Sequence, residues 1–473
     1  MIFVTIFAFL IVSTYGFALP FEGLYQLDII HYNDFHARFE ETSVETPTCR
    51  YNNNSCLGGF PRLYHEIQVL TQEKPDFVLL NAGDSFQGTY WYTLLKWNIT
   101  QQFMNMLPHD AHKLSTPGKV KFTDPREATR REAQALADKG VDIIILLSHC
   151  GLDIDKELAR DYGQYIDIIV GGHSHSLLWN GPAPSGEPVA GPYPVFVEYT
   201  PDKKHKTMIV QASAFTKYMG NLSLFFDYRG DLVKYEGGPI FLDRSIAEDA
   251  EIKAKLAPFA DIVHKAENVP IGETKTSLLF EDCVFGECAL GDALVDSQNE
   301  YAKSKVKSSL DFLSFIQRGN IKSSIPQGTI TEGTLFELLP FNDRMETFEL
   351  QGKWVLEALE RSVRDPWGSH PFKGPWVLQV SGLQVTYNIS KQEGQRVTSV
   401  TIGSTGSGID SDKFYQVTAP AYLAGGGDGF TMFKEYKKNV QVIGRDQKIF
   451  ETYIRKYSPL NITADGRIKI IEE

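Results

Sequence analysis

The stretch YQLDIIHYNDFHARFE, residues 25–40, changes abruptly from an apolar run to a cluster of polar side chains. The apolar part is short and β-branched without a clean alternation, which predicts a strand buried on both faces. The polar part follows at once and contains Asp34 and His36. A solvated loop and a metal site both fit this single stretch, so the choice depends on whether the pattern recurs along the chain.

The pattern recurs three times in the first half of the chain. PDFVLL (75–80) runs into NAGDSFQG, VDIIILL (141–147) into SHCG, and YIDIIV (165–170) into GGHSHS. Helical patterns lie between these runs, such as DPREATRREAQALADKG at 124–140. Buried strands that alternate with helices predict an α/β fold, in which residues beyond the carboxyl ends of the strands converge on one crevice.

This convergence would gather two carboxylates and four imidazoles, which are suitable ligands for zinc, manganese or iron. The six candidates are Asp34, His36, Asp84, His149, His173 and His175. One histidine after a strand is more often hydrogen-bonded than metal-bound, but four strand ends that carry such residues favour a metal site. We expect His31, in the same first stretch, to be structural.

Composition and charge are those of a soluble globular protein. The chain has 473 residues, 42% of them hydrophobic and 22% charged, which suggests two or three domains. The 47 basic and 59 acidic residues give a net charge of −12. That balance argues against nucleic-acid binding and against attraction to anionic membranes through charge alone. An anionic substrate would need a local positive centre, such as a cation.

Both ends of the chain suggest secretion. Residues 1–18, MIFVTIFAFLIVSTYGFA, predict a signal peptide cut near Ala18. A membrane anchor is the alternative, although the run is short for a bilayer span. The final GRIKIIEE lacks the hydrophobic tail of a lipid-anchor signal. We therefore expect a secreted, extracellular protein with no stable membrane anchor.

The cysteines and glycosylation sequons agree with that compartment. Cys49 with Cys56, and Cys283 with Cys288, are close enough in sequence to close small disulfide loops, which leaves Cys150 over. Metal binding by the pairs is the alternative, but their spacing does not match zinc motifs. Sequons that predict glycosylation begin at Asn53, Asn98, Asn221, Asn388 and Asn461.

Taken together, the motifs resemble the 5′-nucleotidase/apyrase family, in particular ecto-5′-nucleotidases and the secreted salivary apyrases of blood-feeding arthropods. The first half carries DIIHYNDFHARFE, NAGDSFQGT, LLSHCGLDID and VGGHSHS, and the second half carries CVFGECALGD, GNIKSSIPQGTIT, LLPF and PAYLAGGGDGF. The resemblance covers nearly the whole mature chain. It implies a calcineurin-like metallophosphoesterase domain followed by a mixed α/β nucleotide-binding domain.

The resemblance also implies roles for individual residues. The six candidates would hold two divalent ions (zinc, or manganese, calcium or magnesium), with Asp84 as the bridging ligand. The ions would polarise the terminal phosphate of a nucleotide and lower the pKa of the attacking water.

In the second half, Phe341 and Tyr422 match the aromatic pair that sandwiches the base, and Asp428 matches the carboxylate near the ribose. Judged alone, the two aromatic residues would be core side chains and GGGDGF a tight turn. Gln317 and Lys322 replace an Asn and an Arg of the family. Lysine is the weaker phosphate ligand, because it lacks the bidentate guanidinium.

Two further positions in this pocket depart from the family. Val284 stands where the family has an Arg. Arg318, next to Gln317, is a candidate to compensate for the lost positive charge.

A larger departure lies in the first half. The family's GNHE/D motif, which supplies an Asn ligand and the histidine that stabilises the transition state, is missing. Helical patterns at 99–107 and 125–139 follow each other with no strand run between them, as if several elements had been removed near residues 112–114. His109 and His112 are weak substitutes. We identify no catalytic histidine, which leaves open whether the site hydrolyses its substrate.

Arg229-Gly230-Asp231 suggests a different activity. It lies between NLSLFF and LVKY, which predict a hairpin with the tripeptide on the exposed turn. Such a turn can present a carboxylate to the metal of an integrin, and an ordinary hairpin turn is the alternative.

Two hypotheses follow. The chain is a metal-dependent hydrolase of extracellular ATP, ADP or AMP with an anti-platelet role in saliva. Alternatively, it is a non-catalytic inhibitor of platelet aggregation that binds an integrin or sequesters nucleotide. The expected domains are a signal peptide (1–18), a metallophosphoesterase domain (19–243), a helical linker (244–268) and a nucleotide-binding domain (269–473).

Overall fold

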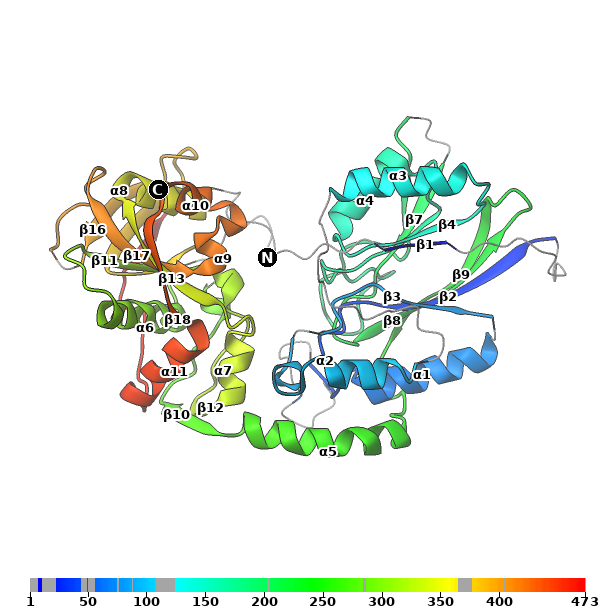
Figure 1. The fold of residues 1–473 in the computed structure, drawn as a ribbon, viewed down its shortest axis with the longest axis horizontal. Helices are drawn as coiled ribbons and strands as arrows, with labels where there is room; N and C mark the ends of the chain where they lie inside the picture. The colour runs from blue at the N-terminus through cyan, green and yellow to red at the C-terminus, as the bar shows by residue number, and fades with distance from the viewer. Residues whose placement is uncertain are drawn as a thin grey trace. The chain divides into compact units, whose positions relative to one another are not determined.

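A computed structural model gives the fold of the chain. The described residues are 7–10 (backbone only), 23–43, 49, 56–74, 76–86, 88–107, 124–201, 205–283, 286–364, 377–403 and 405–472. The chain divides into two compact units, Met1–Val263 and His264–Glu473. Figure 1 shows the elements of each unit. Among the described residues, no helix combines the length and apolar character that a membrane span requires.

Unit 1 contains two β-sheets. One has the strand order β3-β2-β8-β9 and the other β1-β4-β5-β7-β6. The strands of the first are β2 (Tyr25–Tyr32), β3 (Val78–Asn81), β8 (Tyr218–Phe226) and β9 (Leu232–Phe241). Those of the second are β1 (Phe7–Leu10), β4 (Ile144–Leu147), β5 (Ile168–Val170), β6 (Val195–Glu198) and β7 (Lys206–Val210). The pairs β2–β3, β4–β5 and β5–β7 are parallel, so each pair presents its carboxyl ends at one edge.

Helices cover the outer face of each sheet in unit 1. Figure 1 shows α3 and α4 beside the sheet of β4 and β7, and α1 and α2 beside the sheet of β2, β3 and β8. The bounds are α1 (Phe60–Glu73), α2 (Tyr90–Met104), α3 (Pro125–Ala137) and α4 (Leu152–Tyr162). Helix α3 confirms the helix predicted at 125–139. It begins where the Asp124 carboxylate accepts a hydrogen bond from the backbone N–H of Arg126.

The buried faces of β2 explain its sequence. Ile29 packs into the core between the two sheets, and its neighbour Ile30 packs against the helices on the other side. Both side chains are fully buried. A strand between two cores needs apolar residues at successive positions, which is why β2 lacks the alternation of a half-exposed strand.

The segments on either side of the missing family motif end up in different sheets. Strand β3 is the edge of one sheet, and β4 belongs to the other, where its outer side pairs antiparallel with β1. The register runs from Phe7 opposite Leu147 to Leu10 opposite Ile144. Because β1 lies within the predicted signal peptide, cleavage at Ala18 would leave β4 as an exposed edge.

Unit 2 is built on a five-stranded sheet with the order β14-β11-β17-β13-β18, a three-stranded sheet β16-β15-β19 and a β10-β12 pair. The strands are β10 (Pro270–Thr274), β11 (Phe312–Ile316), β12 (Gly328–Thr331), β13 (Arg344–Gln351), β14 (Gln379–Ser381), β15 (Leu383–Asn388), β16 (Val397–Ile402), β17 (Phe414–Pro420), β18 (Lys438–Arg445) and β19 (Ile468–Ile471). The α-helices are α6 (Ala289–Lys305), α7 (Glu332–Leu338), α8 (Gly352–Ser362), α9 (Ala421–Ala424), α10 (Thr431–Tyr436) and α11 (Asp446–Tyr457). One apolar core involves α8 and α10, and a second involves α6, α7 and α11.

Helix α5 (Ala250–Glu267) runs across the division between the units. It lies within the linker predicted at 244–268 and begins at Ala250. The Ser245 hydroxyl donates to the Asp243 carboxylate, and the carboxylate of Asp249 instead accepts from the backbone N–H of Ile252 at the helix start. Segment 244–249 is therefore a turn and an extended link.

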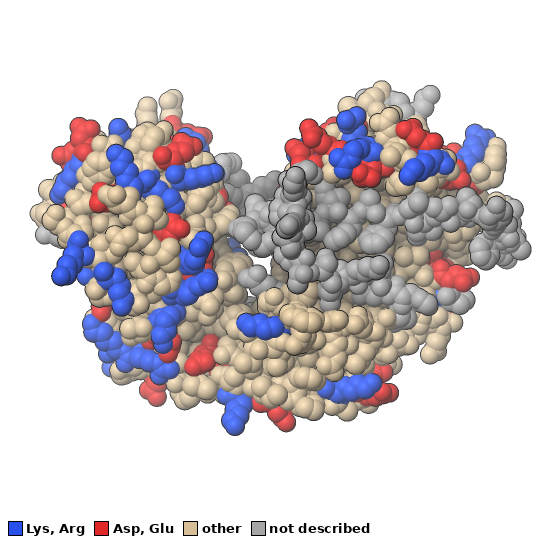
Figure 2. All heavy atoms as spheres, viewed as in Figure 1, with Lys and Arg blue, Asp and Glu red and all other residues tan. Residues whose placement is uncertain are grey.

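Charged side chains are distributed over both units. Figure 2 shows Lys and Arg interspersed with Asp and Glu on the visible face of the described residues. Many of them form ion pairs, for example Lys456 with Glu300 and Lys413 with Asp311. Exposed pairs of this kind contribute little to stability, because water and salt screen the attraction.

Candidate metal centre

The six candidate ligands of unit 1 lie just beyond the ends of β2, β3, β4 and β5 and form two groups. The first group is Asp34, His36 and His175, and the second group is Asp84, His149 and His173. Within each group, one ligand atom from every residue lies within 4.8 Å of the other two. The strand-end pattern therefore brings together side chains from four separate parts of the chain.

The two groups adjoin each other through their carboxylates. Nε2 of His149 lies 3.7 Å from Oδ1 of Asp34 and 3.0 Å from Oδ2 of Asp84. Nε2 of His36 lies 3.7 Å from Oδ1 of Asp34 and 3.5 Å from Oδ2 of Asp84. Both carboxylates thus lie between an imidazole of the first group and an imidazole of the second.

Hydrogen bonds fix Asp34 in this position. Its Oδ2 accepts from the backbone N–H of His173 at 2.9 Å and from Nδ2 of Asn33 at 2.8 Å. Asn33 is held in turn, because its Oδ1 accepts from the backbone N–H of Ala212. Asn33 was not among the residues predicted for the site. Its position next to Asp34 is the signal that points to it.

The first group is more deeply enclosed than the second at its carboxylate. The side chain of Asp34 is 0% exposed, whereas that of Asp84 is 43% exposed. His149 is buried in the wall behind Asp84, with 7% of its side chain exposed. Solvent therefore reaches the centre at Asp84 and also at His175, whose side chain is 36% exposed.

Five of the six candidates adopt a left-handed backbone conformation. The φ values are 49° at Asp34, 48° at His36, 48° at Asp84, 76° at His173 and 51° at His175. Positive φ is uncommon for residues other than glycine, and each instance costs about 1–3 kcal/mol. Such strain concentrates at functional sites, where the surrounding structure fixes the backbone in order to aim a side chain.

Glycines make room for the side chains. A Cβ atom at Gly83 would lie 2.7 Å from Nδ1 of His149. A Cβ at Gly172 would lie 2.8 Å from the same nitrogen and 3.1 Å from Oδ2 of Asp34. All three distances are shorter than ordinary contacts, so these positions require glycine.

The imidazole of His149 is oriented as a metal ligand would be. Its Nδ1 lies 2.6 Å from the carbonyl oxygen of Ala82, which assigns the proton to Nδ1 and directs the lone pair of Nε2 toward Asp84. Nε2 is buried and has no hydrogen bond. An orphaned imidazole nitrogen beside two carboxylates fits a divalent cation.

The electrostatics of the centre agree with this fit. Burial lowers the pKa of His149, but the carboxylates of Asp84 and Asp34 outweigh it and raise the pKa to about 9. Burial raises the pKa of Asp34, but His175, His149 and His36 bring it well below its ordinary value. The centre holds its carboxylates ionised and favours a positive charge between them, which a metal ion supplies better than a proton.

The five residues predicted to contact nucleotide lie in unit 2, and hydrogen bonds join three of them. Oδ1 of Asp428 accepts from the Tyr422 hydroxyl at 2.8 Å, and Oδ2 accepts from Nε2 of Gln317 at 3.0 Å. Nζ of Lys322 lies 5.3 Å from the ring centroid of Phe341. The Phe341 side chain is half exposed and is therefore not a core aromatic.

Burial shifts the pKa of two members of this cluster, Tyr422 and Lys322. Burial raises the pKa of Tyr422 to about 12, and the neighbouring Asp428 acts in the same direction. Burial lowers the pKa of Lys322, and the charge of Arg318 lowers it further. Arg318 therefore lies close enough to Lys322 to share in a positive surface. Val284 lies outside the described residues.

The Arg229-Gly230-Asp231 tripeptide lies on the turn between β8 and β9. The side chains of Arg229 and Asp231 are exposed, while Gly230 is buried with φ 83°. A Cβ at Gly230 would lie 2.7 Å from the carbonyl oxygen of Asp142. The carboxylate of Asp227 accepts from the backbone N–H groups of Arg229 and Asp231, which fixes the turn.

The remaining predicted positions are the cysteines, the glycosylation sequons and two loop histidines. Disulfides join Cys49 to Cys56 and Cys283 to Cys288, and Cys150 is free and half-buried. Asn53, His109 and His112 lie outside the described residues. Asn98 and Asn461 are exposed, Asn388 is partly exposed, and Asn221 accepts a hydrogen bond from Nζ of Lys74.

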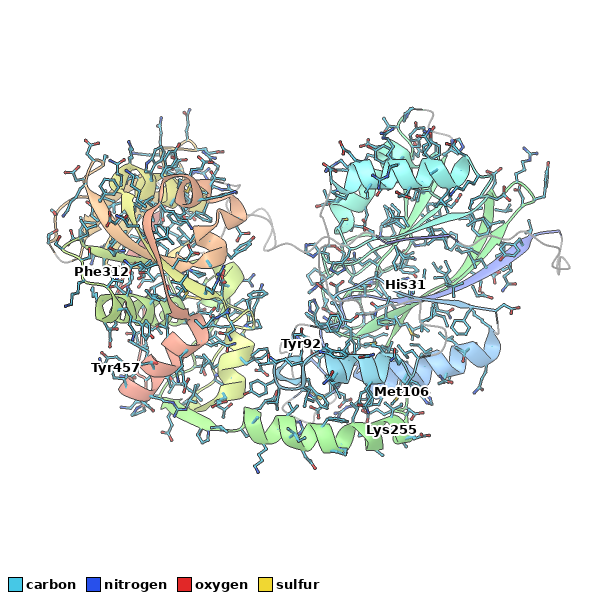
Figure 3. The ribbon with its side chains drawn as sticks, viewed as in Figure 1. His31, Tyr92, Met106, Lys255, Phe312 and Tyr457 are labelled. Carbon is cyan, nitrogen blue, oxygen red and sulfur yellow. A yellow bond between two sulfur atoms is a disulfide. The ribbon has the colours of Figure 1, made fainter. Side chains whose placement is uncertain are left out.

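His31, labelled in Figure 3, is structural, as expected. It is fully buried, and its Nε2 lies 2.7 Å from the Tyr193 hydroxyl. Burial lowers its pKa to about 3, so the ring is neutral at physiological pH. It faces Tyr193 rather than the ligand groups.

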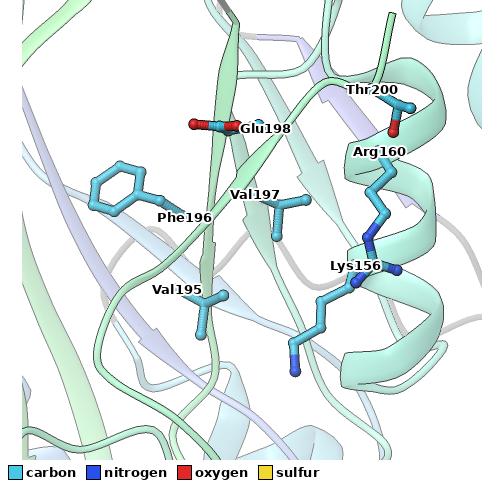
Figure 4. A pocket seen from close by; sticks show the side chains of 7 residues that line it. All are labelled: Lys156, Arg160, Val195, Phe196, Val197, Glu198 and Thr200. Atoms are coloured by element: carbon cyan, nitrogen blue, oxygen red, sulfur yellow. The ribbon is translucent and has the colours of Figure 1, made fainter. Parts of the chain in front are cut away.

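An open depression of about 470 Å³ lies elsewhere in unit 1. Figure 4 shows Lys156 and Arg160 of α4 on one side and Val195–Glu198 of β6 on the other. None of the six candidate ligands lines it. In Figure 4 the side chains of Phe196 and Glu198 point away from the two cations, and we assign the depression no role.

Comparison with known proteins was made at the level of sequence and of structure. A family model described as the 5′-nucleotidase C-terminal domain matches residues 270–435. The chain is 35% identical to an apyrase of Tabanus yao, over 95% of this chain and 94% of that protein. It is 30% identical to a 5′-nucleotidase of Homo sapiens, over 95% and 92% respectively. Among solved structures, a 5′-nucleotidase precursor from Thermus thermophilus superposes with a TM-score of 0.76 at 27% identity, covering 95% of this chain and 100% of that one.

The alignments are longer than the chain itself. The match to the Tabanus yao protein runs over 525 positions, whereas the chain has 473 residues. The relative therefore has residues with no counterpart here.

Proposed function

The chain belongs to the 5′-nucleotidase/apyrase family, and from that premise we propose that it is a secreted, metal-dependent phosphohydrolase of extracellular nucleotides. Its fold is α/β, a calcineurin-like phosphoesterase domain followed by a C-terminal 5′-nucleotidase domain. The observation that carries the proposal is the convergence of the first and second groups into one centre with strained backbone and aligned imidazoles. The donor set is consistent with a dimetal phosphoesterase site.

The residues of the candidate centre would have two kinds of role, as metal ligands and as groups that orient those ligands. Asp34, His36 and His175 would hold one divalent ion, His149 and His173 the other, and Asp84 both. Bound divalent ions polarise a phosphate oxygen and lower the pKa of water, which is chemistry that no side chain here provides. The chain itself supplies orientation. Asn33 and the backbone N–H of His173 fix Asp34, and the carbonyl of Ala82 fixes the His149 ring.

Unit 2 would recognise the nucleoside. The half-exposed ring of Phe341 offers a stacking surface, and Asp428 offers a carboxylate already aligned by Tyr422 and Gln317. Lys322 lies beside Phe341 and provides a positive charge for phosphate. A nucleoside mono-, di- or triphosphate would offer a base to Phe341, a ribose to Asp428 and a phosphate to Lys322.

We further propose that turnover is slow. The missing GNHE/D motif would have supplied a metal ligand and a transition-state donor, and losing one such donor costs about 10²–10³ in rate. The excess length of the aligned relatives supports an internal loss. The metals, the preferred nucleotide and the anti-platelet role in saliva are part of this proposal. Two disulfides fit the extracellular compartment, and cleavage after Ala18 can be checked by N-terminal sequencing of secreted protein.

Phosphate release from ATP, ADP and AMP tests the proposal. EDTA-treated protein should be inactive and should regain activity with added zinc, manganese, magnesium or calcium. Asp84→Ala should abolish the activity, and Asp231→Ala, on the distant hairpin turn, should retain it. Phosphate release that persists in Asp84→Ala or in EDTA would contradict a metal-dependent hydrolase.

A second candidate function rests on the Arg229-Gly230-Asp231 turn. Its two charged side chains are exposed on a turn that Asp227 fixes, which favours presentation to an integrin. Inhibition of fibrinogen binding to platelets that is lost in Asp231→Ala and kept in Glu236→Gln, on the adjacent strand, would support it. Equal inhibition by both variants would rule it out.

A further inference from the structure

Unit 2 contains a cluster of carboxylates that belongs neither to the metal centre nor to the nucleotide cluster. Glu287, Asp292 and Asp465 each place a carboxylate oxygen within 4.8 Å of the other two. Glu287 lies just before α6, Asp292 in its first turn, and Asp465 in the loop before β19. The fold therefore brings acidic groups together from three places, and the question is what balances their charge.

Asp292 is the unusual member of this cluster. Its side chain is 1% exposed, and neither of its carboxylate oxygens has a hydrogen bond. Glu287 differs, because its two oxygens accept from the backbone N–H groups of Gly466 and Ile468, each at 2.7 Å. An ionised carboxylate that is buried without partners is costly, and burial accordingly raises the pKa of Asp292 to about 8. A bound cation would offset that cost and keep the carboxylate ionised.

Arg467 neutralises only part of the cluster. Its guanidinium donates to both oxygens of Asp296, at 2.8 and 3.0 Å, and to both oxygens of Asp465, at 2.9 and 2.6 Å. Its Nε is 3.4 Å from Oδ1 of Asp292, without a hydrogen bond. One guanidinium thus faces three carboxylates, and Glu287 adds a fourth acidic group to the cluster.

We propose that Glu287, Asp292 and Asp465 bind a divalent cation of the hard, oxygen-preferring kind, namely Ca²⁺. The donor set consists of carboxylates alone, with no imidazole or thiolate, which favours calcium over zinc. Calcium also tolerates irregular geometry and a variable number of waters, whereas magnesium requires a near-ideal octahedron. The exposed side of Asp465 gives water access to complete the coordination shell.

The bound ion would fasten three parts of unit 2 together. It would join the start of α6, the loop closed by the Cys283–Cys288 disulfide, and the segment leading into β19, which pairs with β15. Its role is structural and independent of hydrolysis in unit 1. A chain that does not turn over nucleotide would still need it.

Calcium binding can be separated from the phosphoesterase centre by mutation. Full-length Asp84→Asn protein, stripped with EDTA, removes the ligand shared by the two groups of unit 1. Thermal unfolding of this protein should shift upward in a saturable way with added CaCl₂, and isothermal titration should find one calcium site. The same measurements on Asp84→Asn/Asp292→Asn should show neither effect.

Two further variants keep the test decisive if Asp292→Asn folds poorly. Asp465→Asn, at an exposed position, should fold normally in EDTA but bind calcium about 10-fold more weakly. Glu300→Gln, an exposed carboxylate farther along α6, should bind calcium as the parent does. Calcium affinity unchanged in Asp465→Asn, or the absence of any calcium-dependent shift in Asp84→Asn, would overturn the proposal. A protein that gains stability from Asp292→Asn without responding to calcium would overturn it too, because Asp292 would then be a buried acid that is protonated.

Discussion

The first and second groups of the metal centre differ in how completely the chain surrounds them. The first group comes from the ends of β2 and β5, and its Asp34 is fully buried within hydrogen bonds. The second group contains Asp84 after β3 and His149 after β4, the two strands that flank the position of the missing family motif. Its carboxylate is 43% exposed. We therefore expect the missing motif to affect the second group more than the first.

Counting ligands leads to the same conclusion. If Asp84 is shared, as proposed, the first group would offer four side chains, Asp34, His36, His175 and Asp84, which is enough for a four-coordinate ion. The second group offers three, Asp84, His149 and His173. A three-ligand site holds its ion more weakly and leaves more positions for water. The two halves of one centre are thus unequal, and that inequality can be tested.

The largest expected effect concerns alanine substitutions of Asp34 and Asp84. The two variants should differ in the free energy of unfolding and not in the rate of phosphate release. Either Asp→Ala substitution should lower phosphate release by about 10³-fold, since each removes a ligand. Asp34→Ala should also lower the free energy of unfolding by about 2 kcal/mol or more, because the buried donors on Asn33 and His173 lose their acceptor. Asp84→Ala should leave unfolding nearly unchanged. Urea denaturation of both variants in EDTA provides the measurement, and equal losses would contradict the difference in enclosure.

The second prediction concerns His31 and the loss of protein stability at acid pH. His31 has a pKa of about 3 in the folded protein because it is buried, against about 6.5 when unfolded. Below pH 6.5 the unfolded state binds the extra proton, so stability falls as pH decreases from 6.5 toward 3. His31→Gln should show a shallower fall of Tm over this range in EDTA. Identical slopes in the two proteins would contradict it. The carboxylates titrate in both proteins, so their effect on the fall of Tm cancels in the comparison.

The third prediction is that metal binds in two unequal steps. EDTA-stripped protein titrated with manganese should fill the first group at a concentration about 10-fold lower than the second. His175→Ala should remove the tighter step, and His173→Ala the weaker one. Calorimetry resolves the two steps. A single step with two equivalent ions would show that the missing motif does not weaken the second group.

Much of this centre was predictable from sequence, because it depends on a local rule. Each strand is a recognisable apolar run, and parallel strands bring their ends to one edge. Asp34 and Asp84, after the parallel pair β2–β3, could therefore be placed together without a structure, and so could His149 and His173, after β4–β5. The fold class followed from the same alternation of strands and helices. The residues predicted for the nucleotide cluster came from family resemblance instead. Gln317, Tyr422 and Asp428 form hydrogen bonds that no local pattern encodes.

What the sequence did not predict depends on long-range geometry. The positive φ angles of the ligands, the close approach of Gly172 to His149 and the pairing of β1 with β4 arise only when distant segments pack together. The carboxylate cluster around Asp292 escaped notice for the same reason. Its members lie up to 178 residues apart and follow no shared pattern.

The smallest expected effect tests the packing that aligns the second group. Gly172→Ala would place a Cβ atom 2.8 Å from both the Ala82 carbonyl oxygen and Nδ1 of His149. These two atoms form the hydrogen bond that orients the imidazole, so the ring must shift, at a cost of about 1 kcal/mol. The weaker metal step should move to higher concentration by more than the tighter step, because the added Cβ approaches Oδ2 of Asp34 less closely, at 3.1 Å. Gly238→Ala, where an added Cβ meets nothing within 4 Å, is the matched control and should leave both steps unchanged. If Gly172→Ala also left both steps unchanged, the orientation of His149 would not limit metal binding. The inequality of the two groups would then rest on the missing ligand alone.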